Sequence, residues 1–324
     1  MHTIYRRLFC AAALGAALTA PAIATAADWP DRPITMIIMS QEGGGMDRAS
    51  RLVGDALATR LGQPMKYVNR GGASGEIALK MFMKSKDDGY TLFSGNIPTL
   101  MMMYGQKQND YVFDEKVAWL GGYLVDPALL VTPAESAFKT ASEPSKKSPV
   151  RVGIANWASV QTLALLQLRD ATGAQMEIIP YSGFKGASTA LLGNHIEAGV
   201  GNFSATEKLG DGIRYLGIFA DEVPDKDAGV APLSIELGVE LIDAASVRAL
   251  AVHESLKTSH PDRYRKLNEA FRASISDPAF KASFKSIGAK PNQAVEWGEA
   301  EADKMGARIL KQLETYRPMF EKKS

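Results

Sequence analysis

Residues 36–61 constrain the fold of this chain more than any other segment of its sequence. A short apolar run at 36–39 is followed by a polar corner that contains three consecutive glycines at 43–45. Apolar residues then recur at helical spacing as far as Leu61, which predicts an amphipathic helix. Asp47 is the predicted N-cap of this helix, and Gly62 is its predicted C-terminal stop. The segment therefore predicts a strand, a glycine loop and a helix, in that order.

A loop of this kind can hold an anion. Consecutive glycines let the backbone turn with its N–H groups exposed, and the start of a helix adds partial positive charge. The loop lacks the nucleotide pattern GxxxxGK[ST], because Met46 and Asp47 stand where Lys and Ser/Thr would be needed, and it also lacks the spacing GxGxxG. We therefore favour a small carboxylate on the backbone amides of Gly43, Gly44 and Gly45. A tight turn without a ligand is the alternative, since glycine-rich turns are common.

Residues 1–27 are predicted to be an export signal rather than part of the fold. Arg6 and Arg7 form a positive start, 8–20 is an apolar run too short for a mature membrane helix, and 24–26 read Ala-Thr-Ala. We expect cleavage near Ala26 or Ala27 and a periplasmic mature protein. The chain has one cysteine, Cys10, and it lies inside this signal, so the mature protein is expected to carry neither a disulfide nor a lipid anchor.

The charge of the chain limits the classes of partner, and its length indicates the number of domains. A formal net charge of +1 in 324 residues argues against a nucleic acid or a membrane surface as the partner. With the signal set aside, the chain is long enough for two domains, each with its own core. No long apolar run follows the signal, which agrees with an exported protein.

The rest of the chain alternates predicted strands and helices joined by short corners, many of them with glycine. Strands are predicted at 65–70 and 90–93, and a second glycine corner at 71–75 precedes a helix. A second series begins after the polar segment 132–149, with strands at 150–154, 176–181, 198–202 and 214–219. The pattern predicts two α/β modules, each a mostly parallel sheet flanked by helices, joined by crossing strands around a cleft. We assign 28–130 plus 224–324 to domain 1 and 131–223 to domain 2. Ligands of such sheets lie beyond the carboxyl ends of the strands.

Short motifs occur in a specific order along nearly the whole mature chain. They are Trp29-Pro30-Asp31-Arg32-Pro33-Ile34-Thr35, Gly43-Gly44-Gly45-Met46-Asp47, Arg60-Leu61-Gly62-Gln63-Pro64, Asn69-Arg70-Gly71-Gly72-Ala73-Ser74-Gly75, Asp88-Gly89-Tyr90-Thr91-Leu92 and Pro180-Tyr181-Ser182-Gly183. The ordered set resembles the periplasmic solute-binding proteins of the tripartite tricarboxylate transporter systems, the Bug family. The resemblance implies a two-domain Venus flytrap of type II-like fold that closes over a carboxylate-bearing solute.

The resemblance also implies which residues touch the solute. In this family, loop amides and ordered waters hold the carboxylate, and the matching positions are Gly44, Gly45, Asp47, Ser94, Asn96, Asn156, Ser159, Tyr181, Gly183 and Asn202. We add Gln41, Gly43 and Met46 from the same glycine loop. Trp157 is added as an aromatic residue at a loop tip that either stacks on a solute or packs in the fold. The chain departs from the family where Gln41 and Glu42 replace a proline, and we expect Glu42 to oppose a second carboxylate.

The sequence lacks the patterns typical of catalytic and metal-binding sites. His195, His253 and His260 have no ligand spacing, and no GxSxG elbow occurs. We therefore predict no catalytic residue, no metal site, no cofactor and no enzyme activity. The expected protein is a monomeric receptor that delivers a small organic acid to the permease subunits of a tripartite transporter. The alternatives are an exported hydrolase or isomerase acting on a small carboxylate, and a receptor that feeds a sensor protein instead of a permease.

Overall fold

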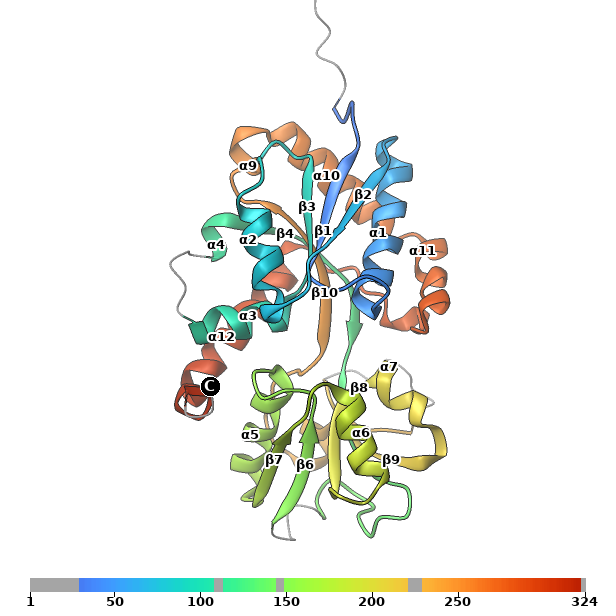
Figure 1. The fold of residues 1–324 in the computed structure, drawn as a ribbon, viewed down its shortest axis with the longest axis vertical. Helices are drawn as coiled ribbons and strands as arrows, with labels where there is room; N and C mark the ends of the chain where they lie inside the picture. The colour runs from blue at the N-terminus through green and yellow to red at the C-terminus, as the bar shows by residue number, and fades with distance from the viewer. Residues whose placement is uncertain (1–28, 108–112, 144–148, 221–228, 322–324) are drawn as a thin grey trace, which may run out of the picture.

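Two lobes, one above the other, make up the computed structural model (Figure 1). The structure describes residues 29–107, 113–143, 149–220 and 229–321. The predicted export signal at 1–27 lies outside the described residues. Each lobe is built around one five-stranded sheet with helices on its faces. The predicted α/β class with two sheets is therefore confirmed.

The upper lobe holds the sheet with strand order β2-β1-β3-β10-β4. β1 pairs in parallel with β2 and β3, whereas β10 runs antiparallel to β3 and β4. The sheet is thus mixed, because β10 returns from the lower lobe in the opposite direction. Its strands are β1 (Ile34–Ile38), β2 (Met65–Asn69), β3 (Thr91–Asn96), β4 (Val117–Asp126) and β10 (Ser246–His253).

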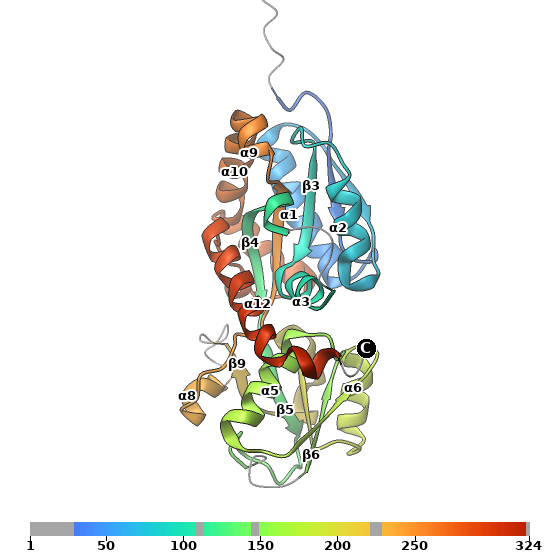
Figure 2. The ribbon, with the colours of Figure 1, turned by 90° about the vertical axis from the view of Figure 1, so that its left-hand side faces the viewer.

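Helices cover both faces of the upper sheet (Figure 2). On the α1 side lie α1 (Gly45–Leu61), α10 (Pro261–Ile275), α11 (Pro278–Ser283), η5 (Phe284–Ile287) and η6 (Pro291–Gln293). The other helical segments of this lobe are η1 (Ala73–Gly75), α2 (Glu76–Met83), α3 (Ile97–Lys107), α4 (Phe113–Lys116) and α9 (Leu256–Ser259).

The lower lobe holds the sheet with strand order β7-β6-β8-β5-β9. β6 pairs in parallel with β7 and β8, and β5 runs antiparallel to both β8 and β9. Its strands are β5 (Ala128–Pro133), β6 (Val150–Ile154), β7 (Met176–Pro180), β8 (Ala198–Asn202) and β9 (Ile213–Phe219). Its helices are α5 (Val160–Thr172), α6 (Phe184–Leu192), α7 (Phe203–Thr206), η3 (Glu207–Gly212) and α8 (Leu233–Leu237).

The long helix α12 (Glu299–Glu321) runs along the side of both lobes (Figure 2). It packs against α3 and β4 of the upper lobe and against α5 of the lower lobe. Gln167 of α5 donates a hydrogen bond to Gln312 of α12 at 2.7 Å. The lobes are therefore joined by the chain at the β4–β5 connection, by the segment that enters β10, and by α12. None of the helices in the described part of the chain is long and apolar enough to cross a membrane.

Helix α1 ends where the sequence predicts, but its N-cap differs from the prediction. Gly62 is the C-cap in the left-handed conformation, with a φ of +68°, as predicted. The predicted N-cap was wrong: Gly44 is the N-cap, and Asp47 lies inside the first helical turn. The reason is that the carboxylate of Asp47 reaches back to the N–H of Gly43, one residue before the cap. Asp47 therefore fixes the loop before the helix instead of capping the helix itself.

Candidate functional site

The glycine loop between β1 and α1 lies at the lobe boundary, at the carboxyl end of β1. Gly43 adopts a φ of +78°, whereas Gly44 is extended with a φ of −73°. The Asp47 side chain is buried and accepts hydrogen bonds from Gly43 N at 2.8 Å, Asn69 Nδ2 at 2.9 Å and Arg51 Nε at 3.0 Å. Within the described residues, the N–H groups of Gly44 and Gly45 have no hydrogen-bond partner. Two of the three predicted amides are therefore still available to a ligand.

The charge of Asp47 is stabilised by these contacts. Burial by itself raises the pKa of the carboxyl, but the hydrogen bonds from Asn69, Gly43 and Arg51 outweigh it and hold the pKa below its usual range. Asp47 is therefore ionised at neutral pH and serves as an internal anion of the loop. Glu42, which was expected to oppose a second carboxylate, forms an ion pair with Arg51 at 3.3 Å, so its charge is partly balanced.

A cavity of about 200 Å³ lies between the lobes, and we call it the interlobe cavity. Its lining residues come from both lobes, and none of them is charged. They include four of the predicted site residues: Asn96, Asn156, Ser159 and Asn202. The remaining lining residues are Ser74, Pro98, Thr99, Ala155, Ala158, Val160, Gln161, Ala245 and Ser246. The cavity thus presents amide and hydroxyl groups where the strands of the two sheets end.

The upper side of the interlobe cavity is held by Asn96. Its Oδ1 accepts hydrogen bonds from Thr99 N at 3.1 Å and Thr99 Oγ1 at 2.9 Å, which fixes the start of α3. Its Nδ2 donates to Ser246 Oγ, the hydroxyl at the start of β10. Asn96, at the carboxyl end of β3, is therefore oriented by its hydrogen bonds to β10 and to α3.

The lower side is held by Ser159 and Asn202. Ser159 is the N-cap of α5: its Oγ accepts from Thr162 N at 3.3 Å and donates to Asn156 O at 3.0 Å. The Asn202 Oδ1 accepts from Gln161 Nε2 at 3.2 Å, and its Nδ2 donates to Asp126 O at the chain crossing. The side-chain amides of Asn96, Gln161 and Asn202 are thus held by hydrogen bonds within the protein.

Ser94 and Trp157 do not line the interlobe cavity, and each contacts other residues of the fold. Ser94 is fully buried, with its Oγ 2.8 Å from Ser50 Oγ and 3.0 Å from Tyr123 OH. Burial raises the pKa of Tyr123, so this network is neutral. The Trp157 ring lies 6.1 Å from the ring of Phe320 of α12, centroid to centroid, and packs on the main core. Trp157 therefore packs in the fold, and its stacking on a solute stays a prediction.

Of the remaining predicted residues, Gln41, Tyr181 and Gly183 lie on loops, and Met46 lies in the first turn of α1. Gln41 is exposed beside the glycine loop, and Met46 packs partly against the core of the upper lobe. The Tyr181 ring packs close to Gly153 and Gly186, and Gly183 donates its N–H to Ala155 O at 2.8 Å. These contacts shape the loops around the cavity.

Sequence reasoning missed a second cavity between the lobes, of about 140 Å³, which we call the cationic cavity. Three basic side chains line it: Arg48 of α1, Lys208 of η3 and Arg248 of β10. Gly45 of the glycine loop lines it as well, next to Arg248. Its signal in the sequence is an arginine inside the otherwise apolar run 247–252.

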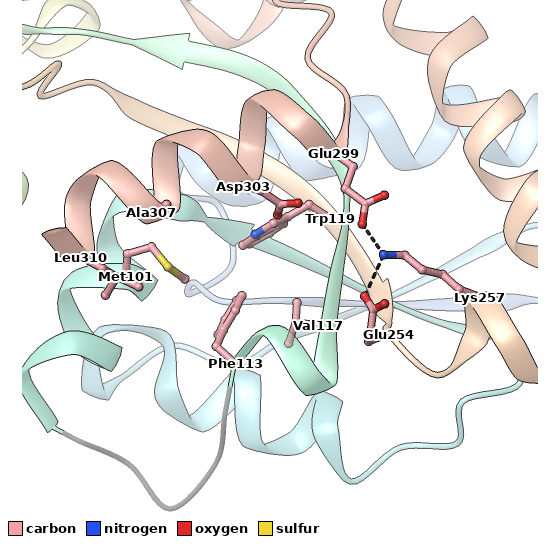
Figure 3. Close-up of a pocket in the computed structure, with 11 residues that line it drawn as sticks. Met101, Phe113, Val117, Trp119, Glu254, Lys257, Glu299, Asp303, Ala307 and Leu310 are labelled. Atoms are coloured by element: carbon pink, nitrogen blue, oxygen red, sulfur yellow. Dashed lines mark hydrogen bonds and ion pairs between the residues drawn. The ribbon is translucent and has the colours of Figure 1, made fainter.

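A cavity of about 430 Å³ lies within the upper lobe beside α12 (Figure 3). Met101 lines it, and Met101, Met102 and Met103 are all buried in the core. At its rim Lys257 lies between Glu254, at 2.9 Å, and Glu299. These charges pair with one another, and no predicted site residue lines this cavity. Among the described residues no three His, Cys, Asp or Glu side chains are grouped as metal ligands would be.

Two α/β lobes, joined by crossing connections and separated by a polar cavity, define a two-lobed solute-binding protein. The family model described as the tripartite tricarboxylate transporter family receptor, TctC, matches residues 49–306. The chain belongs to this family, and the resemblance seen in the sequence is confirmed.

Relatives and solved structures agree with this membership. The chain is 30% identical over 299 residues to a UPF0065 protein of Cupriavidus necator, covering 90% of this chain and 89% of the relative. It is 29% identical over 275 residues to protein BugT of Bordetella pertussis, covering 81% and 82%. A TctC solute-binding protein from Polaromonas has a similar fold, with a TM-score of 0.74 at 23% identity over 91% of this chain and 99% of that one. MatC of Rhodopseudomonas palustris, solved with malate, gives 0.64 at 20% identity over 90% and 99%.

Proposed function

We propose that this protein is an exported receptor that captures a small carboxylate-bearing solute between its lobes and delivers it to the permease subunits of a tripartite transporter. The observation that carries this proposal is the interlobe cavity, because its uncharged donors come from both lobes. Closing the lobes on a solute would surround it with groups that are already oriented. A receptor function is also that of the family.

The carboxylate is assigned from the loop chemistry. The free N–H groups of Gly44 and Gly45 stand at the start of α1, where an anion is favoured. Asn96, Asn156, Ser159 and Asn202 would then hold the rest of the solute. Support comes from two proteins of similar fold, one solved with malate and the other, Rpa4515 of R. palustris, with adipate.

The finer features of the function are proposed with it. We place the mature protein in the periplasm after cleavage near Ala26 or Ala27, as a monomer and without enzyme activity. The division into domains at 28–130 plus 224–324 and 131–223 is likewise a proposal. It is supported by two features of the sheets: β5 begins at Ala128 in the lower sheet, and α8 packs on β9 before β10 re-enters the upper one.

The test is ligand identification followed by thermal unfolding. Mature protein purified gently from the periplasm would be examined by native mass spectrometry for a co-purified organic acid. Malate, adipate, and matched mono- and tricarboxylates would then be titrated. A solute present at ~100 times its dissociation constant should stabilise the fold by about 2.7 kcal/mol. If no carboxylate co-purifies or stabilises the protein, the receptor proposal fails, and turnover of small esters would favour the hydrolase instead.

A further inference from the structure

Arg248 is the basic residue of the cationic cavity whose charge is least neutralised by its surroundings. It lies on β10 and faces the start of α1, where its Nη2 is 3.4 Å from the position that a Cβ would take on Gly45. In the part of the chain that the structure describes, its guanidinium has neither a hydrogen bond nor an ion pair. Burial lowers the pKa of Arg248, and although Asp126 acts against this, the net direction is downward. A desolvated cation without a partner is costly, so the site favours an anion.

Asp126 lines the same cavity and is the carboxylate that could have neutralised Arg248. Its Oδ1 instead accepts hydrogen bonds from Ser204 N at 3.0 Å and Gln293 Nε2 at 3.1 Å, and its Oδ2 accepts from Ser204 Oγ. These donors are neutral, and one of the two residues that supply them belongs to the lower lobe. The lining thus holds three basic side chains and one acidic side chain, and the acidic one accepts its hydrogen bonds from neutral donors.

The other two cations differ from Arg248. Arg48 is exposed and donates from Nη1 to Gly43 O at 2.7 Å, which attaches it to the glycine loop. Lys208 is exposed on η3 of the lower lobe. A closing motion of the lobes would bring Lys208 toward the two arginines of the upper lobe. The positive charge of the cavity thus depends on both lobes, as a ligand-closed site requires.

The cationic cavity adjoins the interlobe cavity through two neighbouring strands. Arg248 lies directly opposite Asn96 in the β3–β10 ladder, and Asn96 lines the interlobe cavity. Ser246, two residues before Arg248 on the same strand, lines that cavity too. Two residues of a strand span about 7 Å, which is within reach of a short dicarboxylate.

We propose that Arg248 binds one carboxylate of a dicarboxylate solute, whose other end lies in the uncharged interlobe cavity. This inference rests on the proposed function and adds the class of solute and the residue that selects it. An arginine can bind a carboxylate through two parallel hydrogen bonds, which loop amides alone do not provide. Free inorganic anions share the charge of a carboxylate, and the experiment separates the two.

The test compares Arg248→Gln with wild type and with Arg265→Gln as the matched control. Arg265 is an exposed arginine of α10 that pairs with Asp262, so its removal makes the same change of charge elsewhere. Calorimetry at constant ionic strength would use succinate and adipate, butyrate and hexanoate, and sodium sulfate. We expect wild type and Arg265→Gln to bind a dicarboxylate at least tenfold more tightly than the matched monocarboxylate. Arg248→Gln should bind the dicarboxylates at least tenfold more weakly than wild type, whereas Arg265→Gln should bind them as wild type does.

The unliganded melting temperature shows whether the variant folds. Because Arg248 has no partner to lose, Arg248→Gln should melt at the wild-type temperature or above it. Equal dicarboxylate affinity in wild type and Arg248→Gln would overturn the inference and leave the receptor function standing. Arg248-dependent binding of sulfate, without dicarboxylate binding, would identify an inorganic anion site and also overturn it. Binding of no carboxylate by wild type would remove the proposed function together with the inference.

Discussion

The carboxylate of Asp47 accepts a hydrogen bond from the backbone N–H of Gly43 at 2.8 Å, so the glycine loop already binds one anion that belongs to the chain itself. Asn69 of β2 and Arg51 of α1 hold the other oxygen. The loop is thereby fixed before a ligand arrives, with two amides left open. Pre-organised donors lose less conformational freedom on binding, which favours affinity.

Replacing Asp47 by asparagine should loosen the loop. The variant keeps the size of the side chain but removes the charge that three donors share, and an amide cannot accept from all of them. We expect Asp47→Asn to lower the free energy of unfolding by about 2 kcal/mol, as measured by urea denaturation. Asp262→Asn, at an exposed position of α10, is the control and should change little. Equal stability of Asp47→Asn and wild type would contradict the role assigned to this carboxylate.

The same carboxylate predicts a pH dependence. The pKa of Asp47 lies below its ordinary value of 3.8 in the folded state, despite burial, because of the hydrogen bonds to it. A lowered folded pKa contributes stability above the unfolded pKa, and this contribution is lost as the pH falls through the folded one. The stability gap between wild type and Asp47→Asn should therefore be full at neutral pH and narrow below about pH 4. Urea midpoints of both proteins at a series of pH values measure this difference in stability. A difference that does not change with pH would contradict the lowered pKa of Asp47.

The two glycines before α1 should respond differently to alanine. Gly43 has a φ of +78° and open space around it, so Gly43→Ala should cost about 1–2 kcal/mol in backbone strain alone. Gly44 has an ordinary φ of −73°, and a Cβ there would meet Gln41 O at 3.5 Å, an ordinary contact. Gly44→Ala should therefore be nearly neutral. Chemical denaturation of both variants decides this, and the reverse order of stability would show that the loop has another conformation in solution.

Ser94→Ala separates the structural role of Ser94 from the predicted role in binding. Its hydroxyl lies in the buried network with Ser50 and Tyr123, so we expect a loss of about 1 kcal/mol of stability. The affinity for the solute should stay within a factor of two of wild type. A tenfold loss of affinity with unchanged stability would place Ser94 in the binding site after all.

The two lobes should move toward each other when the solute binds. Lys290 of the upper lobe pairs with Glu207 of the lower lobe at 2.8 Å, and both side chains are partly exposed, so this contact is weak enough to break. We expect small-angle X-ray scattering to show a smaller radius of gyration at saturating solute than without it. An unchanged radius would mean that the protein is rigid or already closed.

Local signals in the sequence predicted the strands β1–β3 and β6–β9, whereas β4, β5 and β10 were not predicted. Tertiary contacts explain what was missed at the site. Glycine corners and apolar periodicity depend on neighbouring residues, so the strand, loop and helix around Gly43 could be read directly. The role of Asp47 could not, because Asn69 reaches it from another strand. Ser94 looked like a loop residue, since nothing in the sequence shows that Tyr123 covers it. Arg248 escaped notice because the side chains and backbone around it come from several separate elements.

Helix α12 starts on the upper lobe and ends on the lower one, where Phe320 is buried. Deleting its last two turns would remove one of the three links between the lobes without touching either sheet. The choice of where to attach a purification tag or a fluorescent label therefore matters for any transport assay. A label beyond α12 is attached to a helix that contacts both lobes, whereas one placed just before Trp29 is attached to a single lobe.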